Sequence, residues 1–185
     1  MFQEYSHDDS VLTISINQHT VASGSLDRSC QVWNIQHKKR LYTIRQDQSV
    51  DQIELFPTQS SFDLICSGDK TLKVLKAGEL VQLLKHSNFS RRFQLNSDKS
   101  MLAVGYGDSS VNPYEGGVKV WSTTDWTELD DFEIGSIHGV SFNSDSNRIL
   151  AASKSGSLSV IVLNDERLDE MWDEADSESS SEASD

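Results

Sequence analysis

The fold is decided by residues 7–34, which read HDDSVLTISINQHTVASGSLDRSCQVWN. Apolar and polar residues alternate from Val11 to Asn17, and a run of small and apolar residues, 20–25, follows after a polar turn. A third short run covers 30–33. Short alternating runs bounded by Gly, Ser, Asn and Asp predict antiparallel β-strands.

The same pattern recurs three more times. The first strands of the four repeats begin at Val11, Val50, Ser90 and Ile137, and the longest interval contains an insertion from Ser109 to Gly116. Without the insertion the period is about 39 residues. The remaining predicted strands are 40–44, 50–56, 62–68, 72–75, 80–84, 90–96, 101–106, 118–121, 127–132, 137–143, 148–153 and 158–161.

Short strands repeated at this period are typical of the four-stranded blades of a β-propeller. We therefore predict an all-β fold in which residues 1–163 form four blades and residues 1–6 form an outer strand. The fourth repeat shows no outer strand after Leu163. The predicted blades are about 7–45, 46–85, 86–133 and 134–163.

The first repeat resembles the WD-repeat (WD40) family, and the resemblance extends over about residues 2–163. A histidine precedes the first strand by four residues, and a tight-turn aspartate precedes the tryptophan by six. Trp33-Asn34 stands where the family has Trp-Asp. The resemblance implies a buried hydrogen-bond chain, which specifies the packing of one blade. Its expected members are His7, Ser23 or Ser25, Asp27 and Trp33 in the first blade, with Asp69, His86 and Trp121 as the members that the next two blades retain.

The other repeats depart from the family pattern. The second keeps Asp69, but it has Gln46 at the histidine position and lacks the tryptophan. The third has His86 and Trp121, with Glu115 in place of the aspartate, and the fourth has neither His nor Trp. We expect these three blades to be held together by apolar packing more than by polar chains.

Rings of this family usually have about seven or eight blades, so four repeats imply about half a ring. Three arrangements remain open: pairing with a second copy, completion by another protein or by more of a longer chain, and a self-closed four-bladed ring. Residues 2–6 precede His7 as 41–45 precede Gln46, so they resemble the outer strand of another blade. An open half ring would leave two blade faces uncovered.

The net charge of −13 is unevenly distributed. Residues 164–185 hold ten acidic residues and one arginine, a net charge of −9, which leaves −4 for the rest. We interpret this as a nearly balanced domain with an acidic tail, which disfavours nucleic acid as a partner. No apolar run or N-terminal leader pattern predicts membrane insertion or secretion. We expect a eukaryotic cytoplasmic or nuclear location.

No pattern in the chain predicts catalysis. The histidines and the two cysteines lack metal-ligand spacing, and there is no phosphate-binding loop or nucleophile elbow. We therefore predict no enzymatic activity, no cofactor and no metal. The expected function is a protein–protein interaction scaffold in a larger assembly. The alternative is an adaptor that reads a peptide or a modification at the ring's centre, for example in ubiquitin ligation or chromatin regulation.

Two segments are candidates for partner binding. In the insertion, Tyr114 beside Pro113 offers a stiff aromatic contact, although a tolerated hairpin extension explains it equally simply. In the tail, three apolar residues share one helical face among acids. These residues are Leu168, Met171 and Trp172. They either dock into a partner's pocket with a basic rim or pack back onto the propeller.

The last residues of the tail, 177–185, are rich in serine and acid, and this composition predicts disorder. Ser179 has Glu182 three residues later, which resembles the substrates of acidophilic kinases. We predict phosphorylation at Ser179, which would add to the negative charge of the tail.

Overall fold

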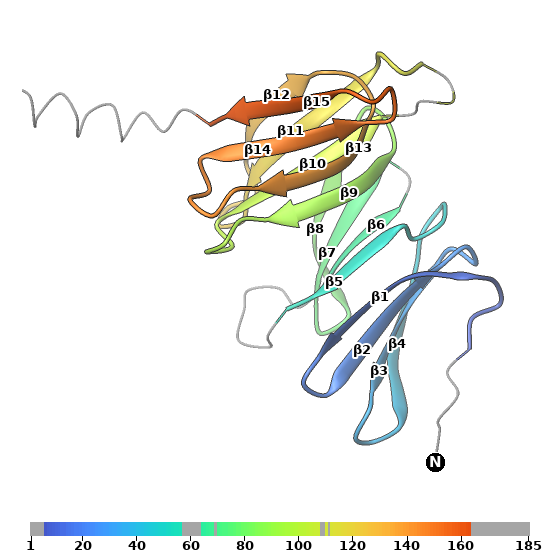
Figure 1. Ribbon diagram of the computed structural model, residues 1–185. Coiled ribbons are helices and arrows are strands. Elements are labelled where there is room, and N and C mark those ends of the chain that lie inside the picture. The colour runs from blue at the N-terminus through green and yellow to red at the C-terminus, as the bar shows by residue number, and fades with distance from the viewer. Residues whose placement is uncertain (1–5, 57–63, 69, 108–109, 111, 164–185) are drawn as a thin grey trace, which may run out of the picture.

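The computed structural model describes residues 6–56, 64–68, 70–107, 110 and 112–163. The secondary structure of these residues consists of β-strands. The strands form four antiparallel sheets, each made of consecutive strands (Figure 1). The first two sheets contain β1 (Val11–Asn17), β2 (Thr20–Ser25), β3 (Ser29–Asn34) and β4 (Lys39–Arg45), then β5 (Gln52–Leu55), β6 (Leu64–Gly68), β7 (Thr71–Lys76) and β8 (Glu79–Lys85). The last two contain β9 (Ser90–Leu95), β10 (Met101–Gly107), β11 (Gly116–Ser122) and β12 (Glu128–Glu133), then β13 (Ile137–Phe142), β14 (Arg148–Ser153) and β15 (Leu158–Val162).

Every strand expected between residues 11 and 162 is present, with bounds that differ by no more than two residues, whereas the expected outer strand of residues 1–6 lies outside the described residues except for Ser6. The repeat is also visible in the register. In each four-stranded sheet the outer strand pair shifts register at the same place, after Val32, Val74 and Val120. These shifts align the sheets position by position, and we call residues that share a register position equivalent. The all-β propeller prediction is confirmed.

The hydrophobic core lies between consecutive sheets. One cluster joins the first sheet to the second, and a second cluster joins the second sheet to the third. A third cluster joins the third sheet to the fourth. Two equivalent glycines let consecutive sheets approach each other closely. A Cβ on Gly24 would lie 2.5 Å from Val50 Cγ1, and one on Gly105 would lie 2.7 Å from Ile137 Cγ2. Each blade is thus stabilised chiefly by burying a face against its neighbour.

The innermost strands of consecutive sheets are also linked by side chains. Ser15 Oγ accepts a hydrogen bond from the backbone N–H of Leu55 (3.0 Å), and the equivalent Gln94 Oε1 accepts one from Phe142 (2.7 Å). The amide of Gln52 bonds both the N–H and the carbonyl of Phe93. The inner strands β1, β5, β9 and β13 therefore follow one another in contact.

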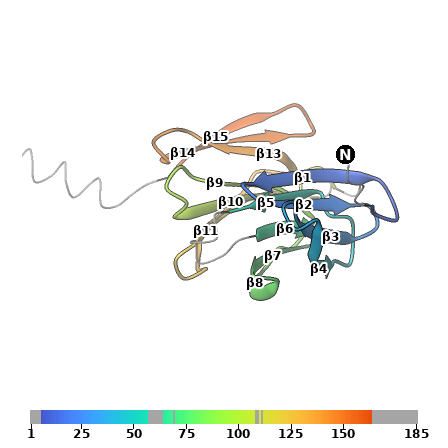
Figure 2. The same ribbon diagram turned by 90° about the horizontal axis from the view of Figure 1, so that it is seen from below.

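The four sheets form an open arc. The sheet of β1–β4 lies at one end and that of β13–β15 at the other (Figure 1), and Figure 2 shows the same arc from below, where the sheets overlap in the view. Among the described residues, no core cluster joins the first sheet to the last. The fourth sheet contains three strands in this part of the chain, where four strands make up each of the others.

Candidate interaction surfaces

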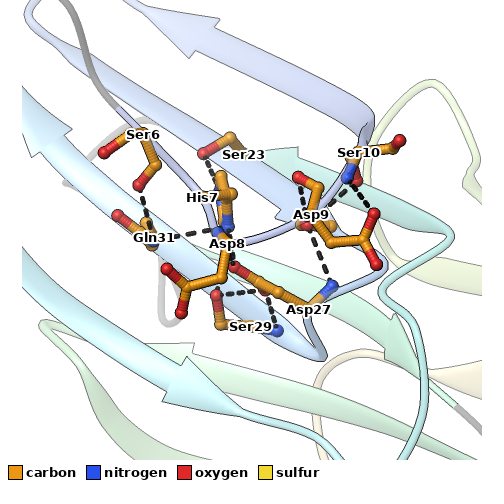
Figure 3. A network of polar contacts seen from close by, with 10 residues as sticks. Ser6, His7, Asp8, Asp9, Ser10, Ser23, Asp27, Ser29 and Gln31 are labelled. Carbon is orange, nitrogen blue, oxygen red and sulfur yellow. Dashed lines mark hydrogen bonds and ion pairs between the residues drawn. The ribbon is translucent and has the colours of Figure 1, made fainter.

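The polar network of the first blade is centred on His7 (Figure 3). Its Nε2 lies 2.7 Å from Ser23 Oγ on β2, and its Nδ1 lies 2.8 Å from Asp27 Oδ2 in the turn before β3. Asp27 Oδ1 in turn accepts hydrogen bonds from the hydroxyl and the N–H of Ser29. This network ties the segment before β1 to two strands, so its role is to hold the blade together.

The carboxylate of Asp27 is stabilised in its charged form. Burial alone would raise its pKa, but hydrogen bonds from Ser29, the N–H of Asp8 and His7 outweigh burial and hold the pKa below its usual range. Ser25 belongs to the same corner, where it donates to the carbonyl of Ser10 (2.9 Å). Asp27 is therefore a structural anchor.

Trp33 contacts the guanidinium of Arg40 across its ring, at 5.5 Å from the ring centroid. This contact joins β3 to the neighbouring β4. Sequence reasoning did not single out Arg40 as the neighbour of Trp33, because the pairing depends on the strand register.

The second blade has a reduced version of the network. Gln46 occupies the position of His7, and its Nε2 lies 3.2 Å from the sulfur of Cys66, the equivalent of Ser23. Lys73 Nζ donates to the carbonyl of Arg45 at 2.6 Å, just as the equivalent Gln31 Nε2 donates to the carbonyl of Ser6 at 3.2 Å. Asp69 lies outside the described residues.

The two cysteines are not reactive groups. Both are fully buried and neither forms a disulfide. Burial raises the pKa of Cys66 to about 12 and also raises that of Cys30. Their thiols therefore stay protonated and pack as small apolar side chains.

In the third blade, the assignment of His86 and Trp121 to a hydrogen-bonded chain is wrong. Val104 and Tyr106 occupy the positions of the two serines of the first blade. Neither ring nitrogen of His86, nor the indole N–H of Trp121, has a hydrogen-bond partner among the described residues. Instead His86 stacks on Tyr106 and meets Trp121 edge-on.

The surroundings of His86 favour its neutral form. Burial and the nearby Lys119 lower its pKa to about 4, and the carboxylate of Asp131 opposes them only in part. Asp131 accepts a hydrogen bond from the Tyr106 hydroxyl (2.7 Å) and pairs with Lys119 (3.0 Å), which also pairs with Glu128 (2.8 Å). Sequence reasoning missed this cluster, because its members come together only through the register of β10, β11 and β12.

The first blade exposes one face of β1. This surface, which we call the leading face, consists of Leu12, Ile14 and Ile16. The side chain of Ile14 is 74% exposed, whereas the equivalent Ile53 and Phe93 are 4% and 3% exposed. The difference follows from position, because each later blade has a preceding sheet that covers this place. Among the described residues, the leading face is therefore an inter-blade surface that no blade covers.

The fourth blade exposes the opposite surface. This trailing face consists of Leu150, Leu158, Val160 and Val162, all of them exposed. Val160 is 64% exposed, whereas its equivalents in the first three blades, Val32, Val74 and Val120, are at most 1% exposed. Contiguous apolar surface of this kind marks an interaction site in soluble proteins.

One residue from each blade lines a pocket on the inner side of the arc. The lining residues are Leu12, Asp51, Arg92 and His138, and the pocket volume is about 230 Å³. The guanidinium of Arg92 donates a hydrogen bond to the carbonyl of Asp51 at 3.0 Å. The pocket thus contains an acid, a base and an imidazole beside one apolar side chain.

The insertion of the third blade presents Tyr114, whose side chain is 88% exposed. Two hydrogen bonds fix the backbone beneath it. The carbonyl of Pro113 accepts one from the N–H of Ser136, and the N–H of Tyr114 donates one to Asn112 Oδ1. Tyr114 and Pro113 belong to the third blade, whereas the leading and trailing faces belong to the first and the fourth. The tail residues Leu168, Met171, Trp172 and Ser179 lie outside the described residues, as do residues 1–5.

Two kinds of feature are absent from the described part of the chain. It contains no helix long and apolar enough to cross a membrane. Within the same residues, no group of three or more His, Cys, Asp or Glu side chains is placed to hold a metal ion.

Comparisons with known proteins agree with this geometry. Residues 2–34 match the model of the family described as WD domain, G-beta repeat. The WD repeat-containing protein pop2 of Schizosaccharomyces pombe is 24% identical over 143 residues, which cover 62% of this chain and 20% of pop2. The resemblance to the WD-repeat family is confirmed. The chain spans about a fifth of the length of this curated relative.

Solved structures of two computationally designed proteins share the fold of this chain. The Ika4 protein superposes with a TM-score of 0.72 at 18% identity, covering 89% of this chain and 100% of Ika4. The Ika8 protein superposes with a TM-score of 0.71 at 18% identity, covering 85% of this chain and 47% of Ika8. The open arc is thus a fold that matches one whole solved chain and about half of another.

Proposed function

We propose that this WD-repeat chain is a non-enzymatic interaction scaffold, a subunit of a larger eukaryotic assembly, that binds protein through the leading and trailing faces. The observation that carries the proposal is the exposure of Ile14 at a position that is buried in the second and third blades. WD repeats generally mediate protein–protein interaction, and the family is generally not enzymatic.

The chemistry of the two faces suits a protein partner. Each is built from aliphatic side chains on one face of a sheet, and inside the molecule such faces are covered by other sheets. A partner that brings an apolar sheet surface would bury them in the same way, and area removed from water is the main driving force of such association.

Site-directed photo-cross-linking tests the proposal. A benzophenone side chain replaces Ile16 on the leading face or Val162 on the trailing face, and the matched control replaces Leu80, an exposed leucine on the outer strand β8. In eukaryotic cells we expect covalent protein adducts at the first two positions and none at Leu80. Adducts absent from both faces, or equally abundant at Leu80, would overturn the proposal.

A second function is supported by the inner pocket. Because its lining combines Asp51, Arg92 and His138 from consecutive blades, it suits a charged peptide group at the centre of a completed ring. This is the adaptor function. It predicts that Asp51→Ala abolishes peptide binding while the cross-links at Ile16 persist; unchanged binding by the variant would exclude it.

A further inference from the structure

A second pocket lies at the seam between the first and second blades. Its volume is about 410 Å³, and its apolar lining comes from both sheets. We call it the seam pocket, and its apolar lining residues are Val32, Leu41 and Tyr42 of the first blade and Leu55 and Ala77 of the second. Leu41 is 48% exposed, so the pocket opens to solvent. A pocket of this size with a mainly apolar lining is typical of ligand sites.

Polar groups stand at one end of the seam pocket. The amide of Asn17 donates a hydrogen bond to the carbonyl of Phe56 (3.2 Å) and accepts one from the N–H of Thr20 (3.2 Å), so it joins the two blades. Thr20 also lines the pocket, and its hydroxyl has no hydrogen-bond partner among the described residues. This hydroxyl can bind the backbone of a peptide whose side chain fills the apolar part.

The next seam shows how an aromatic side chain closes the corresponding corner. Residues 123–127 connect β11 to β12 and include Trp126, which packs against the core cluster that joins the second and third sheets. The turn between β7 and β8 contains only Ala77 and Gly78. Gly78 is the equivalent of Trp126, and a Cβ there would lie 3.0 Å from the ring of Tyr42. The turn of the second blade therefore supplies no large side chain, and the seam pocket remains beside it.

The rim of the seam pocket is basic on the side of β4. Residues 38–40 read KKR and directly precede the two lining residues of this strand. Lys39 lies opposite Asn34, which lies opposite Thr20, so Lys39 is on the face of the sheet that lines the pocket. Glu79 follows the β7–β8 turn on the other side. The described rim thus carries more positive than negative charge, which favours an acidic ligand.

We propose that the seam pocket binds an aromatic side chain presented by an acidic segment of a partner protein. The ring packs against Leu41, Tyr42 and Leu55, and the flanking carboxylates lie beside Lys39. Aromatic side chains are favoured anchors because they bury a large area at a small cost in conformational entropy. The seam lies between two blades of this chain and belongs to neither the leading nor the trailing face. The inference therefore goes beyond the proposed function and does not rest on it.

Fluorescence anisotropy with a labelled synthetic peptide tests the proposal on the full chain. The probe is a fluorescein-labelled peptide of sequence DEEDWDEED. One control probe has alanine in place of the tryptophan, and the other has asparagine and glutamine in place of the acids. At low salt we expect the first probe to bind about tenfold more tightly than either control, because the buried ring and the charges both contribute.

Two pairs of variants locate the binding site. Ala77→Trp fills the seam pocket and is expected to weaken binding of the probe about tenfold or more, whereas Leu80→Trp places the same side chain outside the pocket and leaves binding unchanged. Lys39→Glu is expected to weaken binding, whereas Lys154→Glu makes the same charge change on the fourth blade with little effect. All four positions are exposed, so urea unfolding should show that the variants fold.

Three results would overturn the proposal: no binding of the probe at millimolar concentration, equal binding of the alanine probe, or unchanged binding by Ala77→Trp. If the uncharged substitution Trp172→Ala in the full chain tightens binding of the probe, the chain's own acidic tail is the occupant, and the assignment to a partner protein is wrong. Photo-adducts at Ile16 without probe binding retain the scaffold function and reject this inference, and probe binding without photo-adducts does the reverse.

Discussion

Truncating two equivalent isoleucines tests whether the leading face is covered by association. Ile53 is 4% exposed, so Ile53→Ala loses a buried side chain and leaves a cavity, which costs about 2–5 kcal/mol of unfolding free energy. Ile14 has about a quarter of its surface covered within one chain. Full burial of isoleucine is worth about 2 kcal/mol, so Ile14→Ala costs about 0.5 kcal/mol in an isolated chain.

The costs change when a partner covers the leading face. In an associated chain Ile14 is buried like Ile53, and the cost of Ile14→Ala rises toward about 2–5 kcal/mol. The assay is urea unfolding of wild type and both variants at nanomolar and at tens of micromolar protein, followed by tryptophan fluorescence. We expect the loss of unfolding free energy caused by Ile14→Ala to grow with protein concentration. The loss caused by Ile53→Ala is already large at nanomolar protein, because Ile53 is buried within one chain.

Two results would refute this reasoning. If Ile14→Ala is as costly as Ile53→Ala even at nanomolar protein, Ile14 is already covered within one chain. If it stays nearly neutral at the highest concentration, nothing in the solution covers Ile14, and self-association through the leading face is excluded.

Three further predictions concern the blades themselves. Gly105→Ala should lower stability by about 1–3 kcal/mol, because its Cβ would lie 2.7 Å from Ile137 Cγ2; Gly139→Ala, whose Cβ has only an ordinary contact, serves as the control in the same urea titration. The pKa of Asp27 lies below its usual 3.8 in the folded state, so stability falls as pH drops below about 4, and Asp27→Asn should flatten that part of a stability–pH curve. The pKa of His86 is lowered from 6.5 to about 4, so stability is complete above pH 6.5 and falls between these values; His86→Phe should abolish that loss, and an unchanged pH profile would contradict the assignment.

The strands could be predicted from the sequence because the alternation and the turn residues are local signals. The contacts of His7 with Ser23 and Asp27 were also within reach, since these residues stand at fixed offsets from the first strand, but the hydrogen bonds that Ser29 donates to Asp27 were not predicted. The predicted partial ring agrees with the two exposed faces, because the period fixes how many blades a chain of this length supplies.

The contacts of the third blade could not be predicted in the same way. His86 stands at the same offset as His7, and the resemblance alone implies the same hydrogen bonds. Its actual neighbours depend on which side chains replace the serines, and Tyr106 fills the corner with an aromatic ring. In the second blade, Cys66 stands at the position that Ser23 occupies in the first, and it contacts Gln46. This equivalence could be recognised only from the strand register.

The account's central claim is that association covers the two open faces of the arc, and a second copy of the chain is the partner whose binding can be measured with the purified protein alone. Sedimentation equilibrium over a wide range of protein concentrations measures the solution mass directly. We expect a mass of about twice the 20.7 kDa of one chain, falling toward that of one chain on dilution. A mass of 20.7 kDa that persists at the highest concentration reached would contradict the claim.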